Sequence, residues 1–212
     1  MIHLIQPCYP FDSNSYLITG DRNFLIDAGT GLNSEYLSDS VRRIIGTDGV
    51  LDGILLTHCH ADHIGGVPYL VQVFGCKVYA GYADAEAIRL ADDRYTLASD
   101  FDLMIPSIPV EDLHQDDIID IGEHRFRVIE TPGHTKGGVC FYDEISQSLF
   151  SGDTVFTNGV GRTDFDGGSV TALRNSIKYL IAMAVKDMYP GHGHPTNDGH
   201  AAIMRGLQVV GD

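Results

Sequence analysis

The most constraining feature of this chain is a cluster of metal-ligand groups, Thr57-His58-Cys59-His60-Ala61-Asp62-His63. It places three imidazoles and one carboxylate within six consecutive positions, directly after the apolar run at 53–56. A buried imidazole needs a partner for each ring nitrogen, and a buried carboxylate needs a paired charge. A divalent cation would satisfy several of these groups at once. We therefore expect a metal site here, with a histidine-rich surface loop as the alternative.

Composition limits the kinds of partner. The 212 residues carry 14 basic and 29 acidic side chains, for a formal charge of −15. This balance repels nucleic-acid backbones and anionic membranes, so we expect a small-molecule substrate and neither of those partners. With 43% hydrophobic and 20% charged residues, the chain is globular rather than disordered. Composition leaves the oligomeric state open.

The start of the chain and its cysteines indicate a compartment. No charged and apolar leader follows Met1, and no apolar run approaches the roughly 20 residues needed to span a bilayer. The four cysteines, Cys8, Cys59, Cys76 and Cys140, are widely spaced and form no CxxC pair, which favours free thiols. These features predict a cytoplasmic protein.

Hydrophobic periodicity predicts an α/β fold. Strands are expected at 2–5, 15–19, 23–26, 53–56, 76–79, 118–121, 126–129, 139–142, 148–150 and 188–189. Helices are expected at about 34–45, 67–74, 83–90 and 169–185, and after Asp198. Residues 92–116 break the periodicity and are interpreted as a loop or small excursion over one sheet face. Because both halves contain several strands followed by a helix, we predict one domain over 1–212, a sandwich of two sheets with helices outside.

Three further glycine-containing turns carry metal-type side chains. They are Thr131-Pro132-Gly133-His134, Ser151-Gly152-Asp153-Thr154 and Pro190-Gly191-His192-Gly193, and each follows a predicted strand. Glycine lets a backbone turn sharply close to a cation. Each turn alone is weak evidence. Together with the cluster at 57–63, they predict four strand-end loops that share one site.

With these motifs in this order, the chain resembles the metallo-β-lactamase-fold superfamily. The matching segments are T-H-C-H-A-D-H, P-G-H-T, G-D-T and P-G-H-G. The resemblance implies an αβ/βα four-layer sandwich, with two mixed β-sheets, outer helices and a site for two metal ions at the sheet edge. It also implies the ligands, which are His58, His60 and His134 for one ion, Asp62, His63 and His192 for the other, and Asp153 as the bridge.

The chemistry of these donors agrees with the implied site. Nitrogen and carboxylate ligands without thiolate suit zinc first, and also iron or manganese. Two divalent ions, the carboxylates of Asp62 and Asp153 and one hydroxide leave a net charge of about +1, which attracts an oxyanion or an anionic substrate. His194 is the rival of His192 for its ligand position. Asp27, at a strand end, either supports the site or caps the following turn.

The remaining metal-type residues have no such context. Cys59 lies between two ligands and is expected to point away from them. The other histidines are expected at the surface, and these are His3, His114, His124 and His200.

Within the superfamily, the segment Gly161-Arg162-Thr163-Asp164-Phe165 is similar to the glyoxalase II-like hydrolases and the persulfide dioxygenases. The preferred hypothesis is a dinuclear, hydroxyacylglutathione hydrolase-like enzyme, in which a metal-bridging hydroxide cleaves a thioester or related ester. Asp62 would orient the hydroxide and Asp153 would position the bridge. Arg162 is expected to pair with Asp164, with binding of a substrate anion as the alternative. Lys136 is a second candidate for anion contact.

Other hypotheses use the same fold. A persulfide (sulfur) dioxygenase would hold a single Fe(II) on His58, His134 and Asp153, although the P-G-H-G segment suits it less well. A lactonase or generic esterase would use the same nucleophile. A scaffold protein or nuclease relative is disfavoured by the full ligand set and the acidic charge. About 20 residues follow His192, so the helical extension with which glyoxalase II holds glutathione is not expected.

Overall fold

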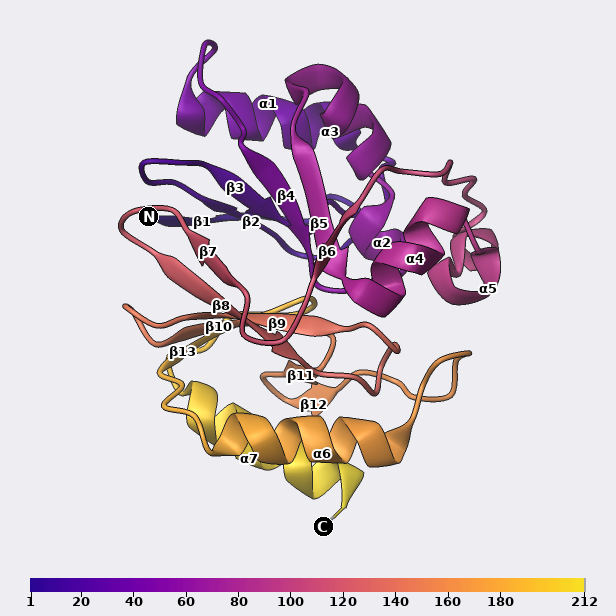
Figure 1. Ribbon diagram of the computed structural model, residues 1–212, viewed down its shortest axis with the longest axis vertical. Helices are drawn as coiled ribbons and strands as arrows, with labels where there is room; N and C mark the ends of the chain where they lie inside the picture. Colours follow the sequence, from indigo (N-terminus) through magenta and orange to yellow (C-terminus); the bar gives the residue numbers. More distant parts are fainter. Residues whose placement is uncertain (212) are drawn as a thin grey trace.

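The computed structural model describes residues 1–211 as two β-sheets packed face to face, with helices on both outer faces (Figure 1). The first sheet is, in spatial order, β1 (Ile2–Ile5), β2 (Ser15–Ile18), β3 (Phe24–Ile26), β4 (Gly53–Leu56), β5 (Lys77–Gly81) and β6 (Glu111–Leu113). Strands β1 to β3 are antiparallel neighbours, whereas β3 to β6 are parallel. Parallel neighbours need long crossovers, and these contain α1 (Ser34–Ile45), α3 (Val67–Phe74) and α4 (Tyr82–Leu90).

The second sheet follows in the C-terminal half. Its spatial order is β13 (Asp187–Pro190), β10 (Ser148–Gly152), β9 (Val139–Asp143), β8 (Arg125–Glu130) and β7 (Ile118–Asp120). Only the pair β10 and β13 is parallel. The helices α6 (Val170–Ile181) and α7 (Gly199–Val210) cover its outer face (Figure 1). Over the described residues, no helix has the length and apolarity needed to cross a membrane.

Three separate apolar cores explain the layering. In β4, Ile54 and Leu56 face the core under α1, α3 and α4, while Leu55 faces the core between the sheets. In β8, Val128 faces the inter-sheet core and Ile129 faces the core under α6 and α7. Successive strand residues point to opposite faces, so both faces of each sheet are buried. This arrangement confirms the predicted αβ/βα four-layer sandwich.

The segment 92–116 is not simply a loop. It contains the short helix α5 (Asp93–Thr96), a 3₁₀ turn at Ala98–Phe101 and the edge strand β6. Strand β6 has two exposed acidic residues and buries only Leu113 between the sheets. Three residues are too few to produce a readable alternation, so the neighbouring β5 determines this strand.

The predicted helix at 169–185 also needs correction, because α6 ends at Ile181. Beyond it, Tyr142 Oη donates to the carbonyl of Ala184 at 2.8 Å. Lys186 N donates to the carbonyl of Gln147 at 2.9 Å. The chain after Ile181 is therefore bound to the second sheet and leads into β13. The small hairpin of β11 (Val155–Phe156) and β12 (Gly159–Val160) was likewise not predicted.

The strand ends that carry the predicted ligands meet at one edge of the sandwich. Backbone hydrogen bonds join the two sheets there, from Val139 N to Thr57 O at 2.8 Å and from Asn14 N to Gly191 O at 2.7 Å. Asn14 Nδ2 also donates to the carbonyl of Pro190 at 3.0 Å. Gly191 N donates to Gly152 O at 2.8 Å, and the hydroxyls of Thr131 and Thr154 lie 2.9 Å apart, so the loops after β8, β10 and β13 are also held together.

Candidate metal centre

Four loops at this edge bring seven histidine and aspartate side chains together. Those after β8, β10 and β13 each contribute one, and the loop after β4 with the short helix α2 (Ala61–Ile64) contributes four. Their ligand-type atoms form three groups, each with all atoms within 4.8 Å of one another, namely His58, His60 and His134; His58, His63 and Asp153; and Asp62, His63 and His192. Every residue predicted as a metal ligand therefore lies at one site.

Asp153 lies between the two halves of this site. Its Oδ2 is 3.7 Å from Nε2 of both His134 and His192, and its Oδ1 is 3.4 Å from His63 Nε2. His192 Nε2 is also 3.1 Å from Asp62 Oδ2. A single carboxylate thus faces both histidine groups.

A chain of hydrogen bonds behind the site orients two of the rings. Asp27 Oδ2 accepts from His63 Nδ1 and from Thr57 Oγ1, both at 2.8 Å. A hydroxyl carries one proton, so Thr57 Oγ1 must accept the 3.1 Å hydrogen bond from His58 Nδ1. Both rings therefore turn Nε2 toward the site, where the neutral form of each ring presents a lone pair. Of the two roles left open by the sequence, Asp27 has the supporting one.

A different loop orients His134. Its Nδ1 donates to the backbone carbonyl of Arg162 at 2.6 Å, which again leaves Nε2 as a lone pair. The neighbouring Gly161 makes this approach possible. A Cβ there would lie 2.0 Å from Asp153 O and 2.8 Å from His134 Nδ1. The segment after β12 therefore serves the site through its backbone.

Two more glycines allow close packing around the ligands. A Cβ on Gly191 would lie 2.3 Å from Asp153 Oδ1 and 2.7 Å from His63 Cε1. Gly152 has a φ of +48°, and a Cβ there would lie 2.6 Å from Thr57 Cβ. Side chains at either position would displace a residue of the site.

The buried polar atoms show that these residues fit a metal. Within residues 1–211, no hydrogen-bond partner reaches Nε2 of His58, His60 or His134, or Oδ1 of Asp153. Leaving one such atom unsatisfied costs about 1–3 kcal/mol. Four of them around one space are accounted for by a bound cation, and imidazole with carboxylate is a donor set for zinc, iron or manganese. The residues present therefore fit divalent metal ions.

Electrostatics divides the site into two halves. Burial and the neighbouring imidazoles lower the pKa of His58 well below its ordinary value, and the pKa of His60 to about 3. The other half consists of Asp62, His63 and His192. Burial opposes their charged forms, but the attraction between the carboxylates and the imidazoles outweighs it. The pKa of Asp62 is therefore lowered, and those of His63 and His192 are raised. Neutral imidazole and ionised carboxylate are the forms that bind metals, so a cation held by His63 and His192 would displace the protons that their raised pKa values favour.

A further buried residue, Asp84, ties two ligand loops together. Its carboxylate accepts from Cys59 N at 2.9 Å, from Thr135 Oγ1 at 2.7 Å and from Gly137 N at 2.6 Å. Burial raises the pKa of Asp84, although these hydrogen bonds oppose the shift. The sequence prediction missed this residue, whose only signal is an aspartate between alanines within a helix.

Several predictions about neighbouring residues can be checked by position. His194 is exposed, and its carbonyl accepts from Thr157 Oγ1 at 2.6 Å, so it lies outside the ligand groups. Cys59 Sγ points away and donates to Tyr95 O at 3.3 Å. The prediction of a surface position is wrong for His124, which is buried with Nδ1 2.7 Å from Asp143 Oδ2. The buried carboxylate of Asp143 needs a partner, and this histidine provides it.

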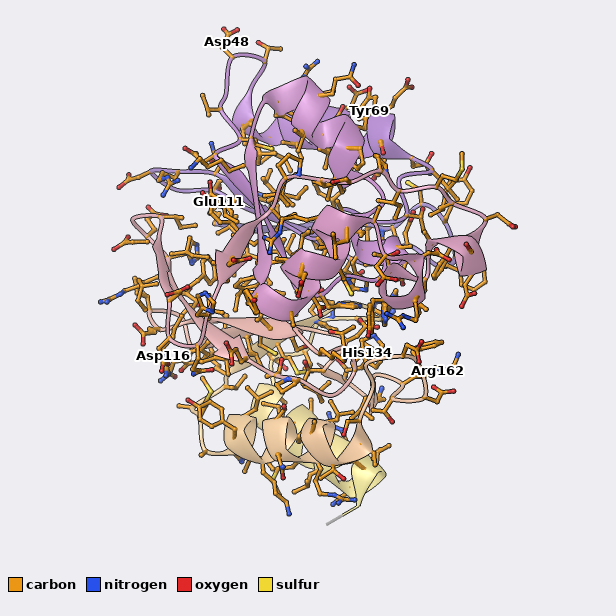
Figure 2. The ribbon with its side chains drawn as sticks, turned by 45° about the vertical axis from the view of Figure 1, so that its right-hand side comes forward. Asp48, Tyr69, Glu111, Asp116, His134 and Arg162 are labelled. Atoms are coloured by element: carbon orange, nitrogen blue, oxygen red, sulfur yellow. The ribbon has the colours of Figure 1, made fainter. Side chains whose placement is uncertain are left out.

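The two candidate substrate contacts lie in different places. Lys136 Nζ donates to Tyr95 Oη at 3.0 Å in a hollow beside the site. Arg162 lines the cleft above the ligands, but its guanidinium forms two hydrogen bonds with Asp164, at 2.9 and 2.7 Å. Figure 2 shows Arg162 at the surface, on the same side of the molecule as His134. The predicted pairing of Arg162 with Asp164 is present.

The predicted ligands lie at the base of an open cleft of about 800 Å³. Ligand residues His60, Asp62, His134, Asp153 and His192 line its floor. Its walls come from the loop before β2, the 3₁₀ turn at Ala98–Phe101 and the segment 156–165. The site is thus accessible to a small molecule from solvent.

Comparisons with known proteins place this geometry in a family. The profile of the metallo-β-lactamase superfamily matches residues 8–192. A probable metallo-hydrolase of Methanocaldococcus jannaschii is 34% identical over 195 residues, covering 87% of this chain and 89% of the relative. The hydroxyacylglutathione hydrolase GloC of Haemophilus influenzae is 29% identical over 201 residues, covering 92% of each.

Solved structures agree with these relatives. The B3 metallo-β-lactamase BLEG-1 has a TM-score of 0.81 at 30% identity, covering 94% of this chain and 95% of that one. A protein solved in a di-iron-bound form has a TM-score of 0.77 at 33% identity, covering 95% and 96%. With the profile covering most of the chain and the four ligand loops meeting at one edge, the chain belongs to the metallo-β-lactamase superfamily.

Proposed function

We propose that this protein is a metal-dependent hydrolase that uses two divalent ions to cleave a thioester or related ester. The observation that carries the proposal is the position of Asp153, whose two oxygens face His63 on one side and His134 and His192 on the other. A bridging carboxylate of this kind supports a pair of ions. The group formed by Asp62, His63 and His192 also favours two ions over the single iron of a dioxygenase.

The protein's own groups would bind and orient. When bound, two divalent ions lower the pKa of water and polarise a carbonyl oxygen. His58, His60 and His134 would hold one ion, with Nδ1 of His58 and of His134 fixed by Thr57 and Arg162.

The other half of the site would hold the second ion and direct the attack. His63 and His192 would supply two lone pairs, with Asp27 fixing the ring of His63. The carboxylate of Asp62, 3.1 Å from His192 Nε2, would accept a hydrogen bond from the attacking water and orient it. No serine or cysteine nucleophile is needed.

The ligand atoms support the choice of metals, and the similar proteins support the substrate class. Imidazole and carboxylate suit zinc first and also iron or manganese, and a structural relative has been solved with two irons. The Haemophilus influenzae relative carries the name of a hydroxyacylglutathione hydrolase, which supports an acyl thioester as the substrate class. Lactones and simple esters are the alternatives, because they present the same carbonyl.

Metal analysis paired with a hydrolysis assay tests this proposal. Protein purified without chelators should contain about two equivalents of metal per chain and should hydrolyse S-lactoylglutathione or a neutral acyl thioester such as S-butyryl-N-acetylcysteamine. H58A and D153A should each lose metal and hydrolysis, whereas H200A, an exposed histidine on α7, should lose neither. Unchanged hydrolysis in H58A or D153A, or one iron with oxygen uptake on a persulfide, would overturn the proposal.

A further inference from the structure

Aromatic rings stand on both sides of the ligand groups. The ring centroid of Phe165 lies 5.6 Å from that of His60 and 6.5 Å from that of His134. On the other side, the ring of Phe156 lies 6.1 Å from that of His192. Both phenylalanines line the cleft. A carbonyl placed over the ligands would therefore have apolar surface on each side of it.

The mouth of the cleft is apolar as well. Phe11 and Phe101, from distant segments, meet edge to face with centroids 6.4 Å apart. Phe11, Leu32 and Tyr9 remain 67%, 55% and 44% exposed, respectively. Single exposed apolar residues need no explanation, but a contiguous set at the rim of a cleft marks a binding surface.

The charges on the walls are unsuited to an anion. Outside the ligand groups, the ionised residues lining the cleft are Asp100, Asp102 and Arg162. Asp164 holds the guanidinium of Arg162 in a two-point pair. Over residues 1–211, the side chains of Asp100 and Asp102 form no ion pair and accept no hydrogen bond. The walls therefore carry a net negative charge and offer no free cation.

We infer that this enzyme acts on thioesters or esters with an apolar acyl group and a neutral or cationic leaving group, and that it discriminates against substrates carrying a carboxylate outside the scissile bond. Such a substrate would lie along the apolar wall that includes Phe165 and Phe101, within the negative potential of Asp100 and Asp102. Glutathione, with two carboxylates and one ammonium, is the wrong kind of leaving group. The inference rests on the proposed hydrolase function and narrows its substrate class.

The size of the discrimination follows from where the charges lie. Asp100 and Asp102 are exposed, so each like-charge contact should change the rate constant by roughly 2- to 5-fold. Each acyl methylene that becomes buried adds up to about 4-fold. Both effects should appear in kcat/KM, and the charge effect should weaken as salt is raised.

A set of thioesters with a common butyryl group isolates the charge of the leaving group. The probes are the cationic S-butyrylthiocholine, the neutral S-butyryl-N-acetylcysteamine, and two anionic thioesters, S-butyryl-3-mercaptopropionate and S-butyrylglutathione. We expect kcat/KM to fall in that order, with the cationic probe at least about 4-fold above the mercaptopropionate. The double variant D100N/D102N should reduce this ratio toward 1. The control D48N replaces one aspartate by asparagine at the far end of the molecule (Figure 2) and should preserve the ratio.

The acyl side is tested on N-acetylcysteamine thioesters with acetyl, butyryl and hexanoyl groups. kcat/KM should rise with chain length, and F101A should flatten this rise. Y179A, which removes a partly exposed ring on α6, should not. Equal rates for all chain lengths, or a preference for the mercaptopropionate or glutathione thioester, would overturn the inference while leaving the hydrolase function intact.

Binding without hydrolysis separates this inference from the proposed function. S-butylthiocholine and S-butyl-3-mercaptopropionate are thioethers that cannot be hydrolysed, and calorimetry can measure their dissociation constants. The cationic thioether should bind more tightly than the anionic one, and D100N/D102N should remove the difference. If no thioester, ester or lactone is hydrolysed, the proposed function fails, whereas equal or reversed thioether affinities would refute the substrate class alone.

Discussion

Asp27 Oδ2 lies 2.8 Å from His63 Nδ1, and both side chains are buried at the point where β3 ends. The same carboxylate accepts from Thr57 N at 2.9 Å and from Thr57 Oγ1 at 2.8 Å. Through Thr57 it reaches His58, so one residue orients a ring in each half of the site. Asp27 adopts this position with a φ of +58°, a conformation that is unusual for a residue other than glycine.

Replacing this carboxylate by an amide should weaken the second metal position. In D27N one of the two oxygens becomes an NH₂ group, which must face either Thr57 N or the donors at Oδ2. The ring of His63 then loses its fixed tautomer, and metal affinity should fall by roughly 10- to 100-fold. Competition with a chromophoric chelator should show that one metal equivalent binds more weakly in D27N and that the other is better retained. D48N should behave as the unaltered protein, and two unchanged affinities in D27N would contradict the assigned role.

The two histidines near the end of β13 should differ sharply. H192A removes the side chain whose Nε2 lies 3.1 Å from Asp62 Oδ2 and 3.3 Å from His63 Nε2. We expect the loss of one metal equivalent and a fall in thioester hydrolysis beyond the roughly 100-fold that outer-sphere substitutions cause. H194A changes an exposed ring of the same type and should stay within about 2-fold of the unaltered protein. Equal losses in the two variants would show that the loop, rather than the ligand, is responsible.

A methyl group at Gly191 should damage the site without unfolding the chain. The added Cβ would lie 2.3 Å from Asp153 Oδ1, so the carboxylate must move. A displacement of about 1 Å can cost roughly 100-fold in rate. We expect G191A to show reduced metal content and hydrolysis with an ordinary circular dichroism spectrum. G159A meets nothing closer than 4.0 Å and is the control. Full activity in G191A would mean that Asp153 need not hold its position.

Acid stability should depend on a buried aspartate far from the ligands. Burial raises the pKa of Asp143, but hydrogen bonds from His124, Ser146 and the backbone outweigh it and leave this pKa below 3.8. The ionised form therefore stabilises the fold above about pH 3.8, and this contribution is lost as the pH falls through the lower folded-state value. In D143N the free energy of unfolding at pH 7 should fall by about 1–3 kcal/mol.

Urea unfolding at several pH values checks this prediction. The difference between the unaltered protein and D143N should be constant from pH 7 to about pH 4 and should shrink toward pH 3. D48N provides the comparison for a lost surface charge. A difference that grows as the pH falls would show that the sign is wrong.

Elements with a strong local signal are predictable in this chain. The apolar run of β4 is buried on both faces, and α1 has helical spacing and ends at Gly46. The edge strand β6 is not predictable from its own residues, because pairing with the neighbouring β5 determines it. The end of α6 is not predictable either, because contacts with β9 and with the turn before β10 draw the chain away from helical geometry.

The site divides in the same way. Histidine and aspartate beside glycine reveal the ligands because their chemistry is carried by the residue type. The groups that orient them become neighbours only when the sheets and loops pack, since Arg162 O lies 28 positions from His134 and Asp84 lies 51 from Thr135. A backbone carbonyl has no signal of its own in a sequence. Lys136, two residues after His134, faces a different hollow. Residue type thus defines which groups can bind a metal. Tertiary packing decides which ring nitrogen each histidine presents, which cationic side chains are already paired, and what shape the cleft takes.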